Sequence, residues 1–208
     1  LDYLEELGVT TIYLNPIGMA NSSHKYDTAD YMHVDSMFGT EEDFVNLVNK
    51  AKEKGMQIVF DGVYNHTGSD SIYFNKYGRF DTLGAYKSKK SKFYEWYDFI
   101  DYPDKYYSWW GIDTLPSIKD DNQDFQNYIA GENGVLDKFM KLGVAGVRLD
   151  VVDEISDEFT KKISDRVHKY GDDRVVMGEV WEDASTKISY SSRRSYFTNN
   201  ELNSVMNY

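Results

Sequence analysis

VAGVRLD, at residues 144–150, is a short apolar run that ends on an acid. QIVFD at 57–61 and VVMGE at 175–179 have the same form. Apolar and β-branched runs of this length predict buried strands. Because helical patterns alternate with these runs, the sequence indicates βα units and a parallel sheet. The helical patterns, the third of them mixed with loop, cover residues 1–7, 40–54, 127–142 and 156–170, with a weaker helix before 202.

Two further strands are predicted near the ends of the chain, TTIYL at 10–14 and LNSVMNY at 202–208, which makes about five. Between His66 and about Asn122 the alternation stops, in a stretch rich in Tyr, Ser, Lys, Gly and Asp. A structureless loop of that length is rare inside a compact domain, so we expect a small inserted domain or a functional lid. The lysine run at 87–92 is expected to be a solvated loop.

The number of strands decides between two architectures. A βα barrel of eight strands takes at least about 200 residues without insertions. The chain has 208 residues, and the insertion takes more than a quarter of them. We therefore expect a partial (β/α)8 barrel, as a segment of a longer barrel chain. An open doubly wound sheet is the alternative, but no Gly-rich phosphate loop follows residues 10–14, so nucleotide binding has no support.

Composition excludes several classes of function. The chain has 23 Lys and Arg against 35 Asp and Glu, a formal charge of −12, which repels phosphate and argues against nucleic acid or an anionic membrane as partner. No apolar run reaches the roughly 18 residues of a membrane span. The absence of Cys excludes disulfides and thiol chemistry. The 18 Tyr, 11 Phe and 4 Trp suit stacking on sugars, although composition alone fits ordinary core filling as well.

Three predicted strands each end on an acid: Asp61, Asp150 and Glu179. In barrels, residues at the carboxyl ends of strands converge on one open face, where the chemistry is done. Asp150 and Glu179 are about one βα unit apart, so adjacent strands bring them together. Two carboxyl groups so placed do not both ionise easily, and one pKa rises, as glycoside hydrolysis requires. A single strand-end acid would instead be read as the cap of the next helix.

The neighbours of these acids strengthen the interpretation. Arg148 points the same way as Asp150 because side chains alternate along a strand, and its charge is expected to keep that carboxylate ionised. A structural salt bridge is the simpler alternative. His66 follows Asp61 on the same loop and can hydrogen-bond a substrate hydroxyl, although a single loop histidine is more often structural. Asn65 lies beside it, and the cluster offers hard oxygens for calcium without the ligand spacing of an EF-hand.

Several motifs together resemble a known family. DGVYNH at 61–66, GVRLD at 146–150 and GEVW at 178–181 are similar, in order, to the first three conserved regions of the α-amylase superfamily, glycoside hydrolase family 13. Within that family the chain looks most like the neopullulanase, cyclomaltodextrinase and maltogenic amylase group. The similarity also covers LNPI at 14–17, HKYDTADY at 24–31, Gly39 and Thr40, and WWG at 109–111 through Leu115 and Pro116.

The resemblance implies a fold and a domain organisation. It places the chain at about strands 2 to 6 of the barrel, with an inserted domain B after the third strand. The expected boundaries are 1–66 for the first barrel part, 67–122 for domain B and 123–208 for the second barrel part. Domain B would then form one wall of the substrate cleft.

The resemblance also implies roles for individual residues. Asp150 matches the catalytic nucleophile, Glu179 the general acid/base, and Arg148 the arginine that fixes the nucleophile. The implied substrate-binding residues include, besides Arg148, His66 at the cleavage point, Tyr26 as an aromatic platform, Asp61 and Trp181. Asp61 and Asn65 are also similar to residues that brace this face, and Asn65 matches a calcium ligand in some relatives. No cofactor is expected to be required for the chemistry, and calcium is the only metal implied.

Three departures from the family pattern stand out. The third acid, an Asp that follows Asn-His after the seventh strand, has no counterpart in these residues. Asp153 and Glu154 stand where many amylases carry Lys and His, which argues against calcium, and Glu182 stands where a His is common. We expect the isolated segment to be unstable and inactive.

The expected activity of the parent enzyme is retaining hydrolysis of α-1,4-glucosidic bonds in starch, maltodextrins or cyclodextrins. The partner is thus an α-glucan oligosaccharide or polysaccharide. Two alternatives remain: a transglycosylase or α-1,6-glucosidase of the same superfamily, and a non-catalytic carbohydrate-binding or scaffold member. The presence of both Asp150 and Glu179 argues against the last.

Overall fold

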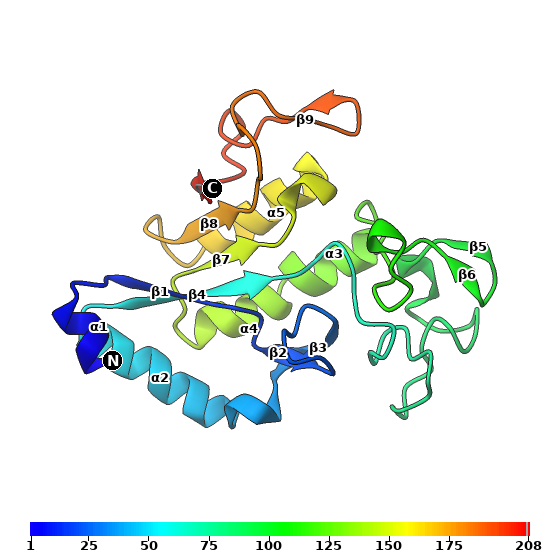
Figure 1. Cartoon of the computed structure of the whole chain (residues 1–208), viewed down its shortest axis with the longest axis horizontal. Helices are drawn as coiled ribbons and strands as arrows, with labels where there is room; N and C mark the ends of the chain where they lie inside the picture. The colour runs from blue at the N-terminus through cyan, green and yellow to red at the C-terminus, as the bar shows by residue number, and fades with distance from the viewer. Residues whose placement is uncertain (207) are drawn as a thin grey trace.

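Five parallel strands form the central sheet of the computed structural model, which describes residues 1–206 and 208 (Figure 1). The spatial order of the strands follows the chain, as in a βα barrel, and the predicted partial barrel is confirmed. Asn207, in the last predicted strand, lies outside the described residues. The strands are β1 (Thr11–Leu14), β4 (Gln57–Gly62), β7 (Gly146–Leu149), β8 (Val175–Gly178) and β11 (Ser204–Val205).

The register of the sheet brings the carboxyl ends of its three middle strands to one edge. Gly62 of β4 pairs with Leu149 of β7, and Leu149 pairs with Gly178 of β8. Asp61, Asp150 and Glu179 stand at these strand ends. The acids therefore share one rim of the sheet, as the sequence predicted.

The helices begin where polar side chains cap them. In α2 (Glu41–Glu53) Thr40 and Asp43 form a reciprocal capping box, and Ser156 caps α5 (Asp157–His168). The expected mixed segment at 127–142 is in fact two helices, α3 (Gln123–Ala130) and α4 (Val135–Lys141), and the first begins earlier because Asn122 caps it. Helix α1 covers Asp2–Glu6.

Outside the inserted segment, two short hairpins were not predicted. One pairs β2 (Gly18–Ala20) with β3 (Thr28–Val34), and the other pairs β9 (Ile188–Ser189) with β10 (Ser192–Arg193). The weaker helix expected before residue 202 was wrong, because the second hairpin and turns occupy that segment. The loop of the first hairpin is held by a buried ion pair, in which Lys25 Nζ lies 2.8 Å from Asp35 Oδ2.

Residues 63–122 extend to one side of the sheet (Figure 1) and contain only short elements. These are η2 (Tyr94–Trp96), β5 (Phe99–Asp101), β6 (Lys105–Tyr106) and η3 (Trp109–Gly111). An aromatic cluster joins the segment to the helices: the ring of Trp96 lies 5.0 Å from that of Phe125 in α3. The four lysines of the 87–92 run are exposed, as predicted. The domain boundaries at 66/67 and 122/123 stay predictions.

Of the helices in the described residues, none has the length and apolar character needed to cross a membrane.

Candidate active site

Three carboxylates converge on the guanidinium of Arg148. Its Nη1 lies 2.8 Å from Asp150 Oδ1 and 2.8 Å from Asp61 Oδ1, and its Nη2 lies 2.9 Å from Glu179 Oε2. The side chain of Arg148 is 4% exposed, and those of Asp150 and Glu179 are 11% and 10% exposed, so these contacts are made largely out of water. Asp150 and Glu179 are thus separated by a single guanidinium group.

The acids open onto a pocket of about 660 Å³. Six of the predicted site residues line it, from four parts of the chain: Tyr26, His66, Arg148, Asp150, Glu179 and Trp181. Asp61 does not line this pocket. Its side chain is fully buried beneath Arg148 and accepts hydrogen bonds from the hydroxyls of Tyr13 and Tyr26, so direct substrate contact, as expected from the sequence, does not fit its position.

Two residues of this site were not singled out from the sequence. Tyr13, on β1, donates to Asp61 and places its ring 5.8 Å from the Arg148 guanidinium, so it supports the charged cluster from below. The sequence feature that could have indicated Tyr13 was its position in the side-chain alternation of the predicted strand at 10–14. Trp109 lines the pocket and stacks on His66 with ring centroids 5.5 Å apart. Trp109 belongs to the WWG motif at 109–111. Two adjacent aromatic residues inside an insertion without periodicity were the sequence feature that could have indicated it.

His66 is neutral and hydrogen-bonded to the backbone. Burial lowers its pKa to about 4, and Nε2 lies 3.0 Å from the carbonyl oxygen of Tyr26. A neutral ring that donates from Nε2 leaves Nδ1 as an acceptor. Nδ1 is buried and has no hydrogen-bond partner among the described residues.

The pKa shifts of the two strand-end acids run opposite to the sequence expectation. Burial, followed by the negative charge of Asp61, raises the pKa of Asp150 to about 7 despite the neighbouring Arg148. Burial alone would raise the pKa of Glu179. Hydrogen bonds from the Trp181 indole (2.9 Å) and the Val151 amide (2.8 Å), together with the charge of Arg148, outweigh it and lower that pKa. Below a pH of about 7, and without substrate, these shifts favour the proton on Asp150.

Val151 has an unusual backbone conformation. Its φ is +38°, in the left-handed region, which is a genuine outlier for a β-branched residue. Val151 immediately follows Asp150 in the chain. Its conformation directs the backbone N–H to Glu179 Oε2. Backbone strain of this kind concentrates at functional sites, where the surrounding structure holds it. The geometry thus couples the two acids through the backbone as well as through Arg148.

Asn65 points to a different pocket from the acids. Both polar atoms of its side chain are buried without a hydrogen-bond partner among the described residues, which suits a metal ligand. In the same part of the chain, however, no group of three His, Cys, Asp or Glu side chains is placed to hold a metal ion. Asn65 is thus a single candidate ligand without an acidic cluster around it among the described residues, and no chemistry is assigned to a metal.

A parallel βα sheet with paired carboxylates at its strand ends is typical of a barrel enzyme. In such enzymes the active site lies at the carboxyl ends of the strands. The alpha-amylase family model, described as the alpha amylase catalytic domain, matches residues 1–208. The chain belongs to this family of glycosidases, and the predicted resemblance is confirmed.

Named relatives are similar over the whole chain. An amylopullulanase of Thermoanaerobacterium saccharolyticum is 40% identical over 227 aligned residues, covering 100% of this chain and 17% of the relative. Neopullulanase 2 of Thermoactinomyces vulgaris is 33% identical and is covered to 34% of its length. The solved structure of the type III pullulan hydrolase from Thermococcus kodakarensis superposes with a TM-score of 0.85 at 31% identity, covering 100% of this chain and 34% of that one. The chain thus spans about a third or less of these proteins.

Proposed function

We propose that the protein is a retaining glycoside hydrolase that cleaves α-1,4-glucosidic bonds in starch, maltodextrins or cyclodextrins. One observation carries the proposal: Asp150 and Glu179 lie on the two nitrogens of one guanidinium, at the wall of a pocket large enough for sugar rings. Retaining glycosidases place their two carboxyl groups about 5–5.5 Å apart, whereas inverting enzymes need roughly 6.5–9.5 Å to admit a water. A shared guanidinium suits the shorter separation.

The reaction then has two steps. Asp150 attacks the anomeric carbon while Glu179 gives its proton to the glycosidic oxygen, so the carbon–oxygen bond breaks and a glycosyl ester forms on Asp150. In the second step Glu179 takes a proton from water, the resulting hydroxide attacks the same carbon, and the ester bond to Asp150 breaks. Two displacements at one carbon return the starting configuration.

This mechanism requires one proton shared by the two acids. Below a pH of about 7 the pair holds one, on Asp150 in the free protein, because the pKa of Asp150 is raised and that of Glu179 is lowered. Closely coupled carboxyl groups titrate as a pair rather than as separate sites. A bound sugar places its anomeric carbon at Asp150 and its glycosidic oxygen at Glu179. The bound sugar thereby favours an ionised Asp150 and a protonated Glu179.

The other pocket residues suit sugar binding. The Tyr26, Trp109 and Trp181 rings provide apolar faces, and sugars present apolar C–H faces that stack on such rings. His66 also lines the pocket, with a ring that its lowered pKa keeps neutral. Residues 67–122 contribute Trp109, so in this proposal they supply one wall of the cleft as domain B.

Cleavage of α-1,6 bonds or glycosyl transfer is the second candidate. The favouring observation is a pair of exposed indoles beside Glu179: the rings of Trp110 and Trp181 meet edge to face with centroids 6.0 Å apart. Such a surface can hold an acceptor sugar in place of water. The printed names of the relatives, an amylopullulanase and a pullulan hydrolase, point to pullulan as a substrate to test.

The test is product analysis with the full chain, meaning the complete parent protein and not the 208-residue segment alone. The substrates are maltotriose, pullulan and cyclodextrin, and the anomer is followed by proton NMR. The proposal predicts cleavage with the α-anomer released first. First release of the β-anomer would refute retention. Binding of maltotriose with no cleavage would instead identify a non-catalytic carbohydrate-binding member. Activity that survives EDTA is also expected, since no metal takes part in the proposed steps.

A further inference from the structure

The β9–β10 hairpin directs one of two neighbouring arginines into the protein. Its strands are joined by only two residues, Tyr190 and Ser191, which both have a positive φ, of +49° and +66°. A two-residue turn of this kind fixes the register of a hairpin, and side chains alternate between its two faces. Arg193 is therefore exposed, whereas the side chain of the next residue, Arg194, is only 5% exposed.

The Arg194 guanidinium binds the backbone of η4 (Val152–Glu154) and of the residue that follows it. Nη1 donates to the carbonyl oxygen of Asp153 at 2.8 Å, and Nη2 donates to that of Ile155. Nε donates to the carboxylate of Asp157, at the start of α5. A planar group with several donors fits acceptors in only one arrangement. Arg194 therefore fixes the path of the chain from η4 into α5.

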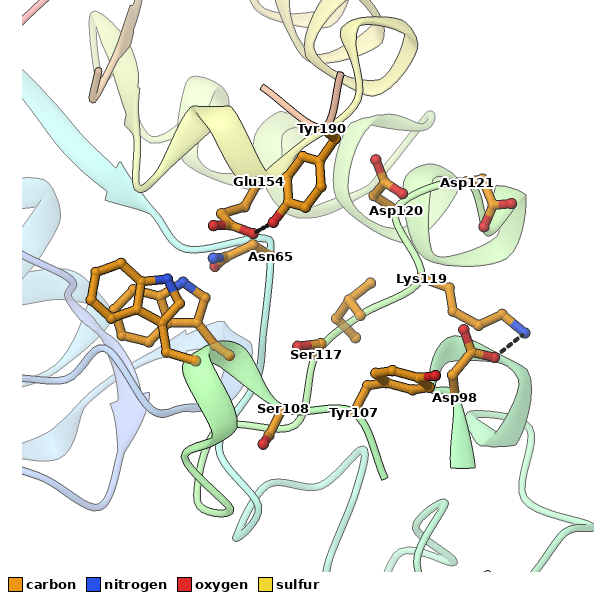
Figure 2. A pocket seen from close by; sticks show the side chains of 13 residues that line it. Asn65, Asp98, Tyr107, Ser108, Ser117, Lys119, Asp120, Asp121, Glu154 and Tyr190 are labelled. Atoms are coloured by element: carbon orange, nitrogen blue, oxygen red, sulfur yellow. Dashed lines mark hydrogen bonds and ion pairs between the residues drawn. The ribbon is translucent and has the colours of Figure 1, made fainter. Parts of the chain in front are cut away.

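Other side chains of the hairpin hold the same turn. Lys187 Nζ lies 3.0 Å from Asp153 Oδ2, and Ser189 Oγ donates to the carbonyl oxygen of Asp153 at 3.0 Å. Figure 2 shows a further contact, in which the Tyr190 hydroxyl donates to the Glu154 carboxylate. Several side chains of one hairpin thus contact a single turn of three residues.

This turn determines the position of a donor to Glu179. It follows Val151, whose left-handed backbone directs its N–H to Glu179 Oε2 at 2.8 Å. A β-branched residue keeps such a conformation only where the surrounding structure holds it. The carbonyl oxygen of Val151 accepts a hydrogen bond from the Glu154 amide at 2.8 Å, so a shift of η4 moves Val151 as well. The η4 turn therefore links the hairpin to the acid.

We infer that Arg194 is a positioning residue for Glu179: by holding η4, it keeps the Val151 N–H on the carboxylate. This inference rests on the proposed function for the role of Glu179 as general acid and base. The alternative is an arginine that only stabilises the fold. The two roles differ in their effect on the chemistry, because a purely structural arginine has no influence on the ionisation of the acid.

The hydrogen bond from Val151 has a measurable consequence. It stabilises the ionised form of Glu179, so its loss raises the pKa of that carboxyl group. The alkaline limb of the pH profile of kcat/KM reports the loss of the proton that the coupled acids hold. This limb therefore moves to higher pH when the bond is lost. The other charged or titratable groups that face Glu179 are unchanged in an Arg194 variant: Arg148, Asp150 and Tyr208.

The test is Arg194→Lys in the full chain, which keeps a positive charge beside Asp157 but loses the planar fork. On maltotriose, kcat is expected to fall on the order of tenfold with KM nearly unchanged. The alkaline limb should rise by about one pH unit. Arg193→Lys is the matched control, because Arg193 is the exposed neighbour and donates to the carbonyl oxygen of Ser185 at 3.3 Å. That control should keep the wild-type kcat and pH profile.

Hydrogen exchange followed by mass spectrometry separates this inference from the proposed function, because it needs no turnover. The peptide that covers residues 151–155 should exchange faster in Arg194→Lys than in the wild type or in Arg193→Lys. If the wild type does not cleave maltotriose, the proposed function fails, while faster exchange in this peptide still supports the hold of Arg194 on the turn. Unchanged exchange there would refute that hold.

Kinetics decide the role when the wild type is active. An unmoved alkaline limb in Arg194→Lys, with or without a lower Tm, would show that the arginine is only structural and would refute the inference. Ser189→Ala removes another donor to the carbonyl oxygen of Asp153 and is the milder variant if Arg194→Lys does not fold. It should move the limb in the same direction by a smaller amount, and an unmoved limb there would also refute the inference.

Discussion

Arg148 is bound directly to Glu179, with Nη2 2.9 Å from Oε2 in a contact almost closed to solvent. The opposite nitrogen of the same group holds Asp150. Because both acids depend on one cation, their positions and their protonation are linked. Arg148 is therefore the electrostatic centre of the site, and its loss affects both acids at once.

Replacing Arg148 by Gln is expected to lower kcat of the full chain on maltotriose by about 10²–10³-fold, the range found when one preorganised electrostatic donor is removed. Arg148→Lys should not restore activity, because an ammonium cannot hold both carboxylates in the same plane. Steady-state kinetics measure the effect. Arg174→Gln serves as control, since the ion pair of Arg174 is with the exposed Asp173 at 3.7 Å, and it should retain wild-type kcat. Wild-type kcat in Arg148→Gln would contradict the account.

The raised pKa of Asp150 predicts a pH-dependent stability. Between its ordinary value of 3.8 and about 7 the folded protein keeps a proton that the unfolded chain releases. The free energy of unfolding therefore falls as pH rises through this window and is flat above it. Asp150→Asn carries no such charge and should be more stable than the wild type at pH 8, by on the order of 4 kcal/mol.

Thermal melts of the two proteins at pH 5 and pH 8 measure this effect. The stability gain of Asp150→Asn should shrink at pH 5, where the wild-type carboxyl is already neutral. An equal difference in Tm at both pH values would show that the pKa of Asp150 is not raised.

Lys25 stabilises the loop that carries Tyr26. It is 3% exposed, and its Nζ contacts Asp35 at 2.8 Å and the carbonyl oxygen of Ala20 at 3.0 Å. Lys25→Met leaves the Asp35 carboxylate buried and unpaired, which is expected to cost about 3–5 kcal/mol of unfolding free energy. Lys54→Met is the control, because Lys54 pairs with exposed Asp2 and Glu5, and its loss should cost far less than the loss of Lys25. Urea denaturation distinguishes the two, and equal losses would contradict the role of the buried pair.

Gly146 is required by close backbone contact between β7 and β8. A Cβ at this position would lie 2.1 Å from the carbonyl oxygen of Val175. Gly146→Ala is thus expected to shift the strand pairing that positions Asp150, with a loss of at least about 1–3 kcal/mol and of most activity. Gly55→Ala is the comparison, since a Cβ there meets nothing within 4 Å and only its positive φ of +71° opposes the change. It should keep activity, and a Gly146→Ala enzyme that does the same would refute the contact.

The main strands could be predicted because their signal is local. VAGVRLD and QIVFD are apolar runs buried on both faces, and the capping residues Thr40 and Ser156 locate the starts of two helices. The β2–β3 hairpin was missed because its pairing is interrupted by register shifts and is fixed by the distant Lys25–Asp35 pair.

The segment before residue 202 was predicted wrongly for a related reason. Arg194 in this segment is buried and donates to the carbonyl oxygens of Asp153 and Ile155, so the turn after Asp150 determines its path. No local periodicity encodes that contact.

The site was predictable in its acids and less so in its environment. Alternation along one strand predicted that Arg148 and Asp150 lie together, and the shared strand ends added Asp61. In the structure both acids contact Arg148. The proton position was not predictable, because it depends on burial and on the charge of Asp61, which act on Asp150 more strongly than Arg148 does. Trp109 lies in a segment without periodicity, so its approach to His66 followed from no local pattern.

The central claim is that Asp150 becomes covalently bonded to sugar during turnover. The most direct measurement uses a fluorinated glucosyl fluoride, which forms the glycosyl-enzyme quickly and releases it slowly, followed by peptide mass spectrometry of the full chain. The account predicts one added glycosyl group on the peptide that contains Asp150, and none in Asp150→Asn. An active enzyme whose added sugar lies on another residue, or on none, would contradict it.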